Sequence, residues 1–213
     1  MRVTRLILWR HGRTGWNHSG RIQGQLDAEL DDVGLLQAAA TAPALAALAP
    51  LLVVSSDLSR ASRTAQFLGE LTGLPVTLDP RLRERHYGRW QGLTGEEIAQ
   101  RYPAEYAAWR RGEPEPDPTI EPLAAFGARS STALREIADR LDGTGTAVVV
   151  THGGAAQAGA ATLLGLPPSL WRALAVLSNC AVMDLRLNPN RGWTLHAHNL
   201  LGPDDPPPGQ PGR

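Results

Sequence analysis

The chain has 213 residues, of which 42% are hydrophobic and 20% are charged, a composition typical of a globular protein. Its 21 basic residues balance 21 acidic ones, so there is no net positive field to hold a polyanion, and we expect no nucleic-acid partner. No apolar run approaches the ~18 residues of a membrane-spanning helix, the first apolar stretch is too short for a secretory signal, and Cys180 is the only cysteine, so we expect a cytoplasmic protein with no membrane partner.

Short apolar runs typical of buried β-strands recur along the chain. They cover residues 3–9, 51–56, 75–78, 146–151, 181–187 and, more weakly, 193–198. Patterns typical of helices lie between them. These cover residues 32–49, with Pro43 expected to kink or break the helix, and residues 58–73, 93–112, 123–143 and 153–165.

The alternation of strands and helices predicts an α/β fold. We expect a three-layer sandwich, with a mostly parallel central sheet, helices on both faces and an antiparallel edge formed by the last two strands. Residues 1–200 are expected to form a single domain, since their number fits one ordinary domain. The tail, residues 201–213, is rich in proline and glycine, and we expect it to be disordered.

Unusual polar residues follow three of the predicted strands. Arg10 and His11 follow the first strand, Arg60 closes the SSDLSR segment after the second, and His152 and Gly153 follow the fourth. In open α/β sheets ligands bind beyond the carboxyl ends of the strands, so these side chains are expected to converge. A lone histidine is more often structural, but three such coincidences favour a functional site.

Two arginines and two histidines together favour phosphoryl chemistry. The arginine fork matches the non-bridging oxygens of a phosphoryl group, and one imidazole can attack phosphorus. The main alternative use, a metal site, is less favoured because the arginines would repel a divalent cation, and no HExxH-like spacing occurs. The chain has no lysine, which excludes Schiff-base chemistry and the GxxxxGK[ST] phosphate loop. Glu84 is a candidate acid for the leaving oxygen, although its arginine-rich surroundings are also typical of an ion-paired surface loop.

Four ordered motifs resemble the histidine phosphatase superfamily, in the branch that contains the cofactor-dependent phosphoglycerate mutases. They are RHGRTGWN with the following RIQGQLD, SSDLSRASRTA, RLRERHYGRWQGLT and VVTHGG, and they span roughly residues 3–200. Within the branch, the segments are most similar to those of actinobacterial glucosyl-3-phosphoglycerate phosphatases. The resemblance implies a phosphoglycerate mutase-like fold and a phosphoric monoester hydrolase that needs neither a metal nor an organic cofactor.

The resemblance also implies a role for each candidate residue. His11 would be the nucleophile that becomes phosphorylated, Arg10 and Arg60 would hold the phosphoryl oxygens, His152 would donate to one of them, and Glu84 would act as acid and then as base. Further contacts to the phosphate or the substrate are implied for Asn17, Gln23, Gly24 and Gly153. The expected partner is a small phosphorylated metabolite, such as a sugar or glycerate phosphate, and the expected assembly is a homodimer.

Three functions remain open at this level: a phosphatase, a phosphoglycerate mutase and a catalytically silent protein that binds a phosphorylated ligand. The WRR sequence resembles mutases, in which paired arginines hold a carboxylate, so Arg110 and Arg111 are candidate substrate ligands; solvent-facing charges at a helix end are the alternative. Gly95 lies where mutases carry a lysine, and little chain is available to enclose the site, which favours hydrolysis. The GGES-like segment of many members is replaced here by PTIEPL, which retains only Glu121.

Overall fold

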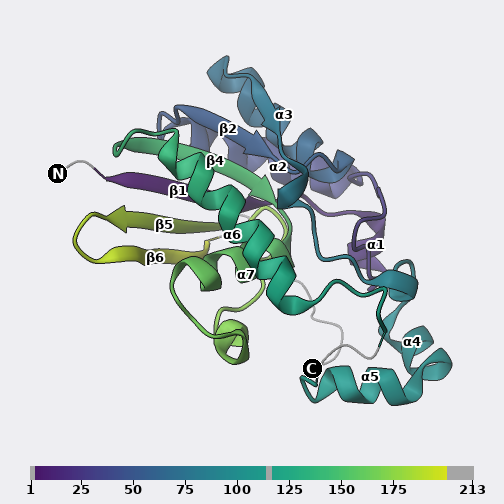
Figure 1. Ribbon diagram of the computed structural model, residues 1–213. Helices are drawn as coiled ribbons and strands as arrows, with labels where there is room; N and C mark the ends of the chain where they lie inside the picture. Colours follow the sequence, from purple (N-terminus) through teal and green to yellow (C-terminus); the bar gives the residue numbers. More distant parts are fainter. Residues whose placement is uncertain (1–2, 114–116, 201–213) are drawn as a thin grey trace.

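The computed structural model describes residues 3–113 and 117–200, so the tail expected to be disordered lies outside the described residues. The centre of the fold is a six-stranded sheet in the order β3-β2-β4-β1-β5-β6 (Figure 1). The first four strands in this order are mutually parallel. Strand β5 is antiparallel to β1, and β6 is antiparallel to β5. The predicted α/β class and the antiparallel edge are therefore confirmed. The strands are β1 (Thr4–Arg10), β2 (Leu52–Ser55), β3 (Val76–Leu78), β4 (Gly145–Thr151), β5 (Val182–Asn188) and β6 (Gly192–Leu200).

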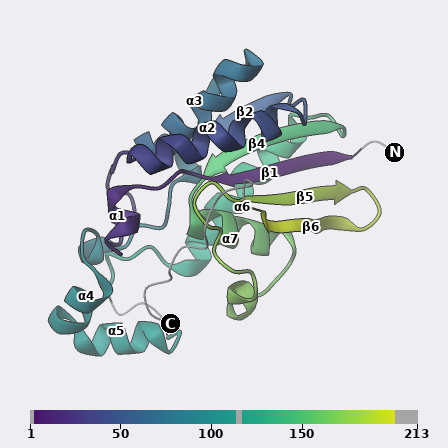
Figure 2. The same cartoon turned by 180° about the vertical axis from the view of Figure 1, so that it is seen from behind.

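Helices cover both faces of the sheet (Figures 1 and 2). Two pack on one face, α2 (Asp32–Ala46) and α3 (Ser59–Thr72), and two on the other, α6 (Leu123–Asp139) and α7 (Gly153–Leu163). The side chains of β1 alternate between these two layers. Leu6 and Leu8 belong to the apolar cluster under α6 and α7, whereas Ile7 and Trp9 belong to the cluster under α2 and α3. Because successive strand side chains alternate between faces, a strand with a helical layer on each side must be apolar throughout.

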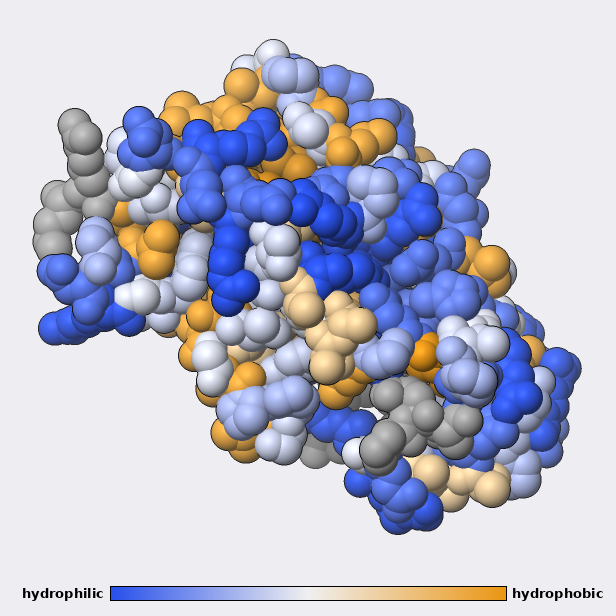
Figure 3. Space-filling model, in the orientation of Figure 1, coloured by the Kyte–Doolittle hydropathy of each residue, from blue (hydrophilic) through white to orange (hydrophobic). Residues whose placement is uncertain are grey.

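The remaining helices are short. They are α1 (Gly15–His18), α4 (Gly95–Arg101) and α5 (Pro103–Arg110), with 3₁₀ turns at η1 (Pro80–Leu82), η2 (Gly88–Trp90) and η3 (Pro168–Ala173). None of the helices in residues 3–113 and 117–200 is long and apolar enough to cross a membrane. The surface over α6 is largely hydrophilic, and the hydrophobic side chains on that side form small separate groups (Figure 3).

The structure corrects two helix predictions in detail. Of the two alternatives given for Pro43, a kink or a break, the break does not occur, since α2 continues to Ala46. The carbonyl that Pro43 leaves without a partner belongs to Ala39, which is exposed, so water can bond it. The pattern over residues 93–112 forms two helices, α4 and α5, because Pro103 cannot donate within a helix and begins a new one.

Helices α4 and α5 lie beyond the carboxyl ends of the parallel strands, away from the helical layers (Figures 1 and 2). An aromatic cluster anchors them: the buried Trp90 ring meets Tyr106 and Trp109 edge to face, with ring centroids 6.2 and 5.9 Å away. Edge-to-face contacts of this kind add to the stabilisation from burial. The cluster therefore holds α5 over the end of the sheet where the predicted site residues lie.

The segment after β1 packs directly on the first turn of α2, backbone against backbone. A Cβ at Gly12 would lie 2.3 Å from the carbonyl oxygen of Gly34, and one at Gly34 would lie 2.0 Å from that of Arg13. Real Cβ atoms do not approach carbonyl oxygens so closely, so both positions require glycine. This contact determines where His11 lies relative to the helix.

We expect Gly34→Ala to destabilise the protein by about 1–3 kcal/mol, the usual cost of overpacking, and to lower activity by displacing the His11 segment. Gly15→Ala is the matched control, because nothing lies within 4 Å of a Cβ at that position. Thermal unfolding and turnover of the two variants test this. If Gly34→Ala unfolds at the wild-type temperature and turns over at the wild-type rate, the segment after β1 can move to accommodate a side chain, and the prediction is wrong.

Candidate active site

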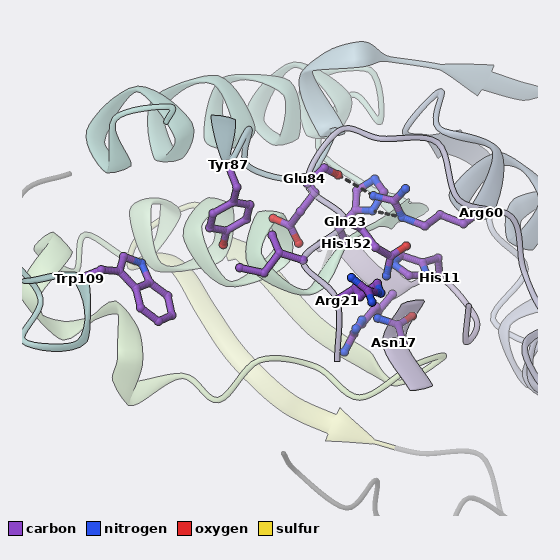
Figure 4. A pocket seen from close by; sticks show the side chains of 12 residues that line it. His11, Asn17, Arg21, Gln23, Arg60, Glu84, Tyr87, Trp109 and His152 are labelled. Atoms are coloured by element: carbon purple, nitrogen blue, oxygen red, sulfur yellow. Dashed lines mark hydrogen bonds between the residues drawn. The ribbon is translucent and has the colours of Figure 1, made fainter. Parts of the chain in front are cut away.

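The side chains at the three strand ends converge on one cavity of about 230 Å³ (Figure 4). Arg10 ends β1, Arg60 lies in the first turn of α3, and His152 caps α7. The cavity is lined by Arg10, His11, Asn17, Arg21, Ile22, Gln23, Gly24, Arg60, Glu84, Tyr87, Trp109 and His152. All five predicted catalytic residues are in this set, together with Asn17, Gln23 and Gly24 from the predicted substrate contacts.

His11 is buried and oriented by its own backbone. Its Nδ1 lies 2.7 Å from the carbonyl oxygen of Gly12, so Nδ1 carries the proton and Nε2 has a free lone pair. Burial, reinforced by the charges of Arg60 and Arg10, lowers the pKa of His11 well below its usual value near 6.5. His11 is therefore neutral at physiological pH, which is the form that acts as a nucleophile.

Backbone carbonyls hold Arg10 and Arg60, the two arginines predicted to be catalytic. Arg60 is fully buried and donates from its two terminal nitrogens to the carbonyls of Gly24 and Leu26, each at 2.8 Å. Arg10 donates to the carbonyl of Leu177, and its buried Nε has no partner within the described residues. Burial lowers the pKa of Arg60 to about 10, and it also lowers the pKa of Arg10. Both remain cationic at neutral pH and can bind an anion.

His152 is held between Arg60 and Ser56. Its Nδ1 accepts from Arg60 Nε at 3.2 Å, so its Nε2 carries the proton and donates to Ser56 Oγ at 2.8 Å. Its ring centroid is 5.1 Å from that of His11. Burial, and then the Arg60 charge, lowers the pKa of His152 well below its usual value. In this arrangement the predicted donation to a phosphoryl oxygen requires a second proton, on Nδ1.

Glu84 reaches the cavity from the segment between η1 and η2 (Figure 4). Its carboxylate accepts from the backbone N–H of Arg85 at 2.8 Å and from that of Gly154 at 2.9 Å. A Cβ at position 154 would lie 2.4 Å from Glu84 Oε1, so glycine is required for this contact. The positive end of the α7 dipole and the two N–H groups therefore fix the carboxylate at the cavity wall.

The predicted substrate contacts fall into different groups. Gln23 Oε1 is buried without a partner in the described part of the chain, so it is available to a ligand. Asn17 Oδ1 accepts from the backbone of Thr14 and from Asn179 Nδ2, which stabilises the turn next to His11. The Gly24 backbone has a φ of +53°, a conformation that favours glycine, and its carbonyl holds Arg60.

A second cavity of about 790 Å³ adjoins the first. The two share Arg10, Glu84, Tyr87 and Trp109. Gly153 and Arg110 line the larger cavity, as does Arg172, whereas Arg111 lines neither and pairs with Glu113. The predicted pair of arginines is therefore divided: Arg110 faces the cavity and Arg111 does not.

Sequence reasoning missed several residues that the structure places in or beside the site. Ser56 directly follows β2, and the rule of strand carboxyl ends could have identified it. The other missed residues are Arg21, Tyr87, Trp109, Trp171 and Arg172. Across residues 3–113 and 117–200, no three histidine, cysteine or acidic side chains are grouped as metal ligands would be.

A neutral buried histidine in one cavity with two arginines, at the carboxyl end of a parallel sheet, is typical of phosphoryl-transfer enzymes. The chain belongs to the histidine phosphatase superfamily (branch 1), whose model matches residues 6–201, which confirms the resemblance seen in the motifs.

Relatives support phosphomonoester hydrolysis. The chain is 42% identical to a glucosyl-3-phosphoglycerate phosphatase of Mycolicibacterium vanbaalenii over 87% of this chain and 85% of that one. It is 41% identical to a metal-independent phosphoserine phosphatase of Arabidopsis thaliana over 73% of this chain and 67% of that one. The solved structure of a mycobacterial glucosyl-3-phosphoglycerate phosphatase with inorganic phosphate matches with a TM-score of 0.82, at 40% identity over 95% of this chain and 99% of that one.

The buried histidines predict how stability depends on pH. Their pKa values lie well below 6.5 in the folded protein and near 6.5 in the unfolded chain. Just below pH 6.5 the unfolded chain therefore binds more protons, so the free energy of unfolding falls as the solution is acidified.

We expect a slope of up to about 1.4 kcal/mol per pH unit for each histidine below pH 6.5. Thermal unfolding of the wild type, His11→Asn and His152→Gln between pH 7 and 5 measures it. Each variant should show a shallower loss of stability than the wild type. Equal slopes in all three proteins would mean that the histidines are not held neutral by the fold.

Proposed function

We propose that the protein hydrolyses phosphomonoesters in two displacement steps through a phosphohistidine on His11. The observation that carries the proposal is the contact between His11 Nδ1 and the Gly12 carbonyl, which frees Nε2 in a cavity that Arg10 and Arg60 also line. In the first step the Nε2 lone pair forms a bond to phosphorus, and the bond from phosphorus to the leaving oxygen breaks. That oxygen takes a proton from protonated Glu84.

Arg10 and Arg60 hold the non-bridging oxygens during this step, and the Gly12 carbonyl stabilises the positive charge that develops on the His11 ring. The negative charge of the phosphoryl group favours the protonated form of His152, which then donates to one of its oxygens. In the second step a water molecule attacks phosphorus, Glu84 takes its proton, and the electron pair of the phosphorus–nitrogen bond returns to Nε2.

For the substrate we propose glucosyl-3-phosphoglycerate. The larger cavity begins at Glu84, where the leaving group must lie, and its volume is in the range of sites for small organic ligands. Trp109 and Tyr87, which are half-buried, offer apolar ring surfaces for a sugar, and Arg110 and Arg172 can bind a carboxylate. The similarity to enzymes named for this substrate supports the assignment.

A mutase is the second candidate, but the cavities favour hydrolysis. A mutase must exclude water from the phosphohistidine, whereas here the His11 cavity adjoins a space of about 790 Å³. A catalytically silent protein is the third alternative, and the presence of all five predicted catalytic side chains in one cavity argues against it.

We also propose that residues 1–200 act as one catalytic domain and that catalysis needs no metal or organic cofactor. The enzyme works as a homodimer in the cytoplasm, on a small metabolite.

Phosphate release tests the proposed function. We expect release from glucosyl-3-phosphoglycerate without added metal, loss of at least about 10³-fold in His11→Asn, and no change in His18→Ala, an exposed histidine of α1. Acid quenching during turnover should trap an acid-labile phosphoryl group on the wild type and none on His11→Asn. Conversion of 3- to 2-phosphoglycerate with 2,3-bisphosphoglycerate, without phosphate release, would identify a mutase instead.

The arginines of the larger cavity make a separate prediction. We expect Arg110→Met and Arg172→Met each to raise KM for glucosyl-3-phosphoglycerate by about 10-fold or more, because each loses a hydrogen bond to a charged group. Arg111→Met is the control, since Arg111 lines neither cavity. 4-Nitrophenyl phosphate, whose leaving group has no carboxylate, should be hydrolysed equally by all three. An unchanged KM in Arg172→Met would exclude Arg172 from substrate binding.

A further inference from the structure

Arg129, in α6, lines neither cavity, yet every N–H of its guanidinium has an acceptor. Nε and Nη2 donate to the two carboxylate oxygens of Glu121, at 2.6 and 2.8 Å. Nη1 donates to the carbonyls of Arg81 and Arg83, at 2.8 and 2.7 Å, and Nη2 donates also to the carbonyl of Glu84, at 2.9 Å. One side chain therefore binds three carbonyls in the four residues that end at Glu84.

Glu121 binds the chain on the other side of Glu84. Its carboxylate accepts from the backbone N–H of His86 at 3.2 Å, and its own N–H donates to the His86 carbonyl at 2.9 Å. Its carbonyl accepts from Arg85 Nε at 2.8 Å. The Arg129–Glu121 pair therefore holds the backbone both before and after Glu84.

The Glu84 segment needs this support because it has no regular structure of its own. Residues 83–86 lie between η1 and η2, so their carbonyls have no sheet or helix partners. The planar arginine fork supplies donors to three carbonyls from one rigid group, and Gln25 Nε2 adds a donor to the Glu84 carbonyl at 3.1 Å. Glu121 and Arg129 are largely covered, with side chains 16% and 21% exposed, so water replaces them poorly.

We propose that Arg129, oriented by Glu121, is the residue that positions Glu84 for proton transfer to the leaving oxygen. The proposal rests on the proposed role of Glu84 as the acid. The pair fixes the backbone at residue 84 so that the carboxylate meets the Gly154 N–H at the cavity wall. A shift of about 1 Å in a catalytic group is enough to slow a reaction strongly. Glu121, the one residue retained from the GGES-like segment, does this without the missing glycines and serine.

Substrates with different leaving groups test the proposal. The leaving groups of glycerol 3-phosphate and glucosyl-3-phosphoglycerate are poor alkoxides that need an acid to protonate them. The 4-nitrophenolate ion, in contrast, leaves 4-nitrophenyl phosphate readily without one. We expect Arg129→Met to lower kcat/KM for both alkyl phosphates by about 10-fold or more, within the range that general acids contribute. For 4-nitrophenyl phosphate we expect a change in kcat/KM of less than about 3-fold, because kcat/KM reports only the steps up to departure of the leaving group and does not include the later step in which Glu84 activates water. Glu121→Gln should show the same selectivity to a smaller degree.

Three further variants separate the explanations. Arg129→Lys keeps the charge near His152 but not the fork, and we expect it to behave like Arg129→Met. Arg5→Met breaks the Arg5–Asp184 ion pair, which has a similarly covered pair of side chains and lies at the opposite end of β1. It should affect all substrates equally. Glu84→Gln should reproduce the selective loss.

The outcomes are distinct. An equal loss, or no loss, for alkyl and aryl phosphates in both Arg129 variants and in Glu121→Gln would overturn the positioning role, as would full rescue by lysine. If Glu84→Gln itself showed no selectivity, the proposed function of Glu84 would fail instead. Thermal unfolding of each variant identifies any that do not fold, and Glu121→Gln and Arg129→Lys, which replace one polar side chain by another, then carry the test.

Discussion

The hydrogen bond between His11 Nδ1 and the carbonyl of Gly12 is the contact on which the rest of the site depends. It selects the tautomer with a free Nε2, and it requires the backbone at Gly12 to hold one position. That position is set by the close approach of Gly12 to Gly34, where neither residue tolerates a side chain. The packing of α2 against the segment after β1 therefore fixes the Gly12 carbonyl, and through it the orientation and tautomer of His11.

The arginines of the cavity differ from several others in their partners. Outside the smaller cavity Arg83 forms an ion pair with Asp57, and Arg129 pairs with Glu121 while also donating to three carbonyls. In the part of the chain that the structure describes, Arg10 and Arg60 donate to backbone carbonyls or to His152 and to no carboxylate. A carbonyl orients a guanidinium without neutralising it, so the cavity keeps positive charge for an anion. Burial is the main cause of the lowered pKa values of His11 and His152, and these charges lower them further.

Much of this could be predicted from the sequence, because apolar runs identify the strands and strand carboxyl ends meet at one edge of the sheet. That reasoning correctly brought Arg10, His11, Arg60 and His152 together. It also gave Glu84 as a candidate acid, and the family resemblance favoured this role over a surface ion pair. The function of Arg129 could not be predicted: within a helical pattern it looks like any surface charge, and its partners lie 8 to 48 residues away. Which of Arg110 and Arg111 faces the larger cavity depends on the residue at which α5 ends, and composition alone does not determine that residue.

The two adjoining cavities are built from different parts of the chain. Strand ends, the first turn of α3 and the cap of α7 contribute Arg10, His11, Arg60 and His152 to the smaller cavity, and these elements belong to the core. Much of the larger cavity is formed by α5, η3 and the loop after η3, which lie outside the sheet. Mutations in those outer segments can therefore change which alcohol is released without disturbing the core that forms the phosphoryl site. An architecture of this kind lets substrate range diverge during evolution while the bond-breaking chemistry stays the same.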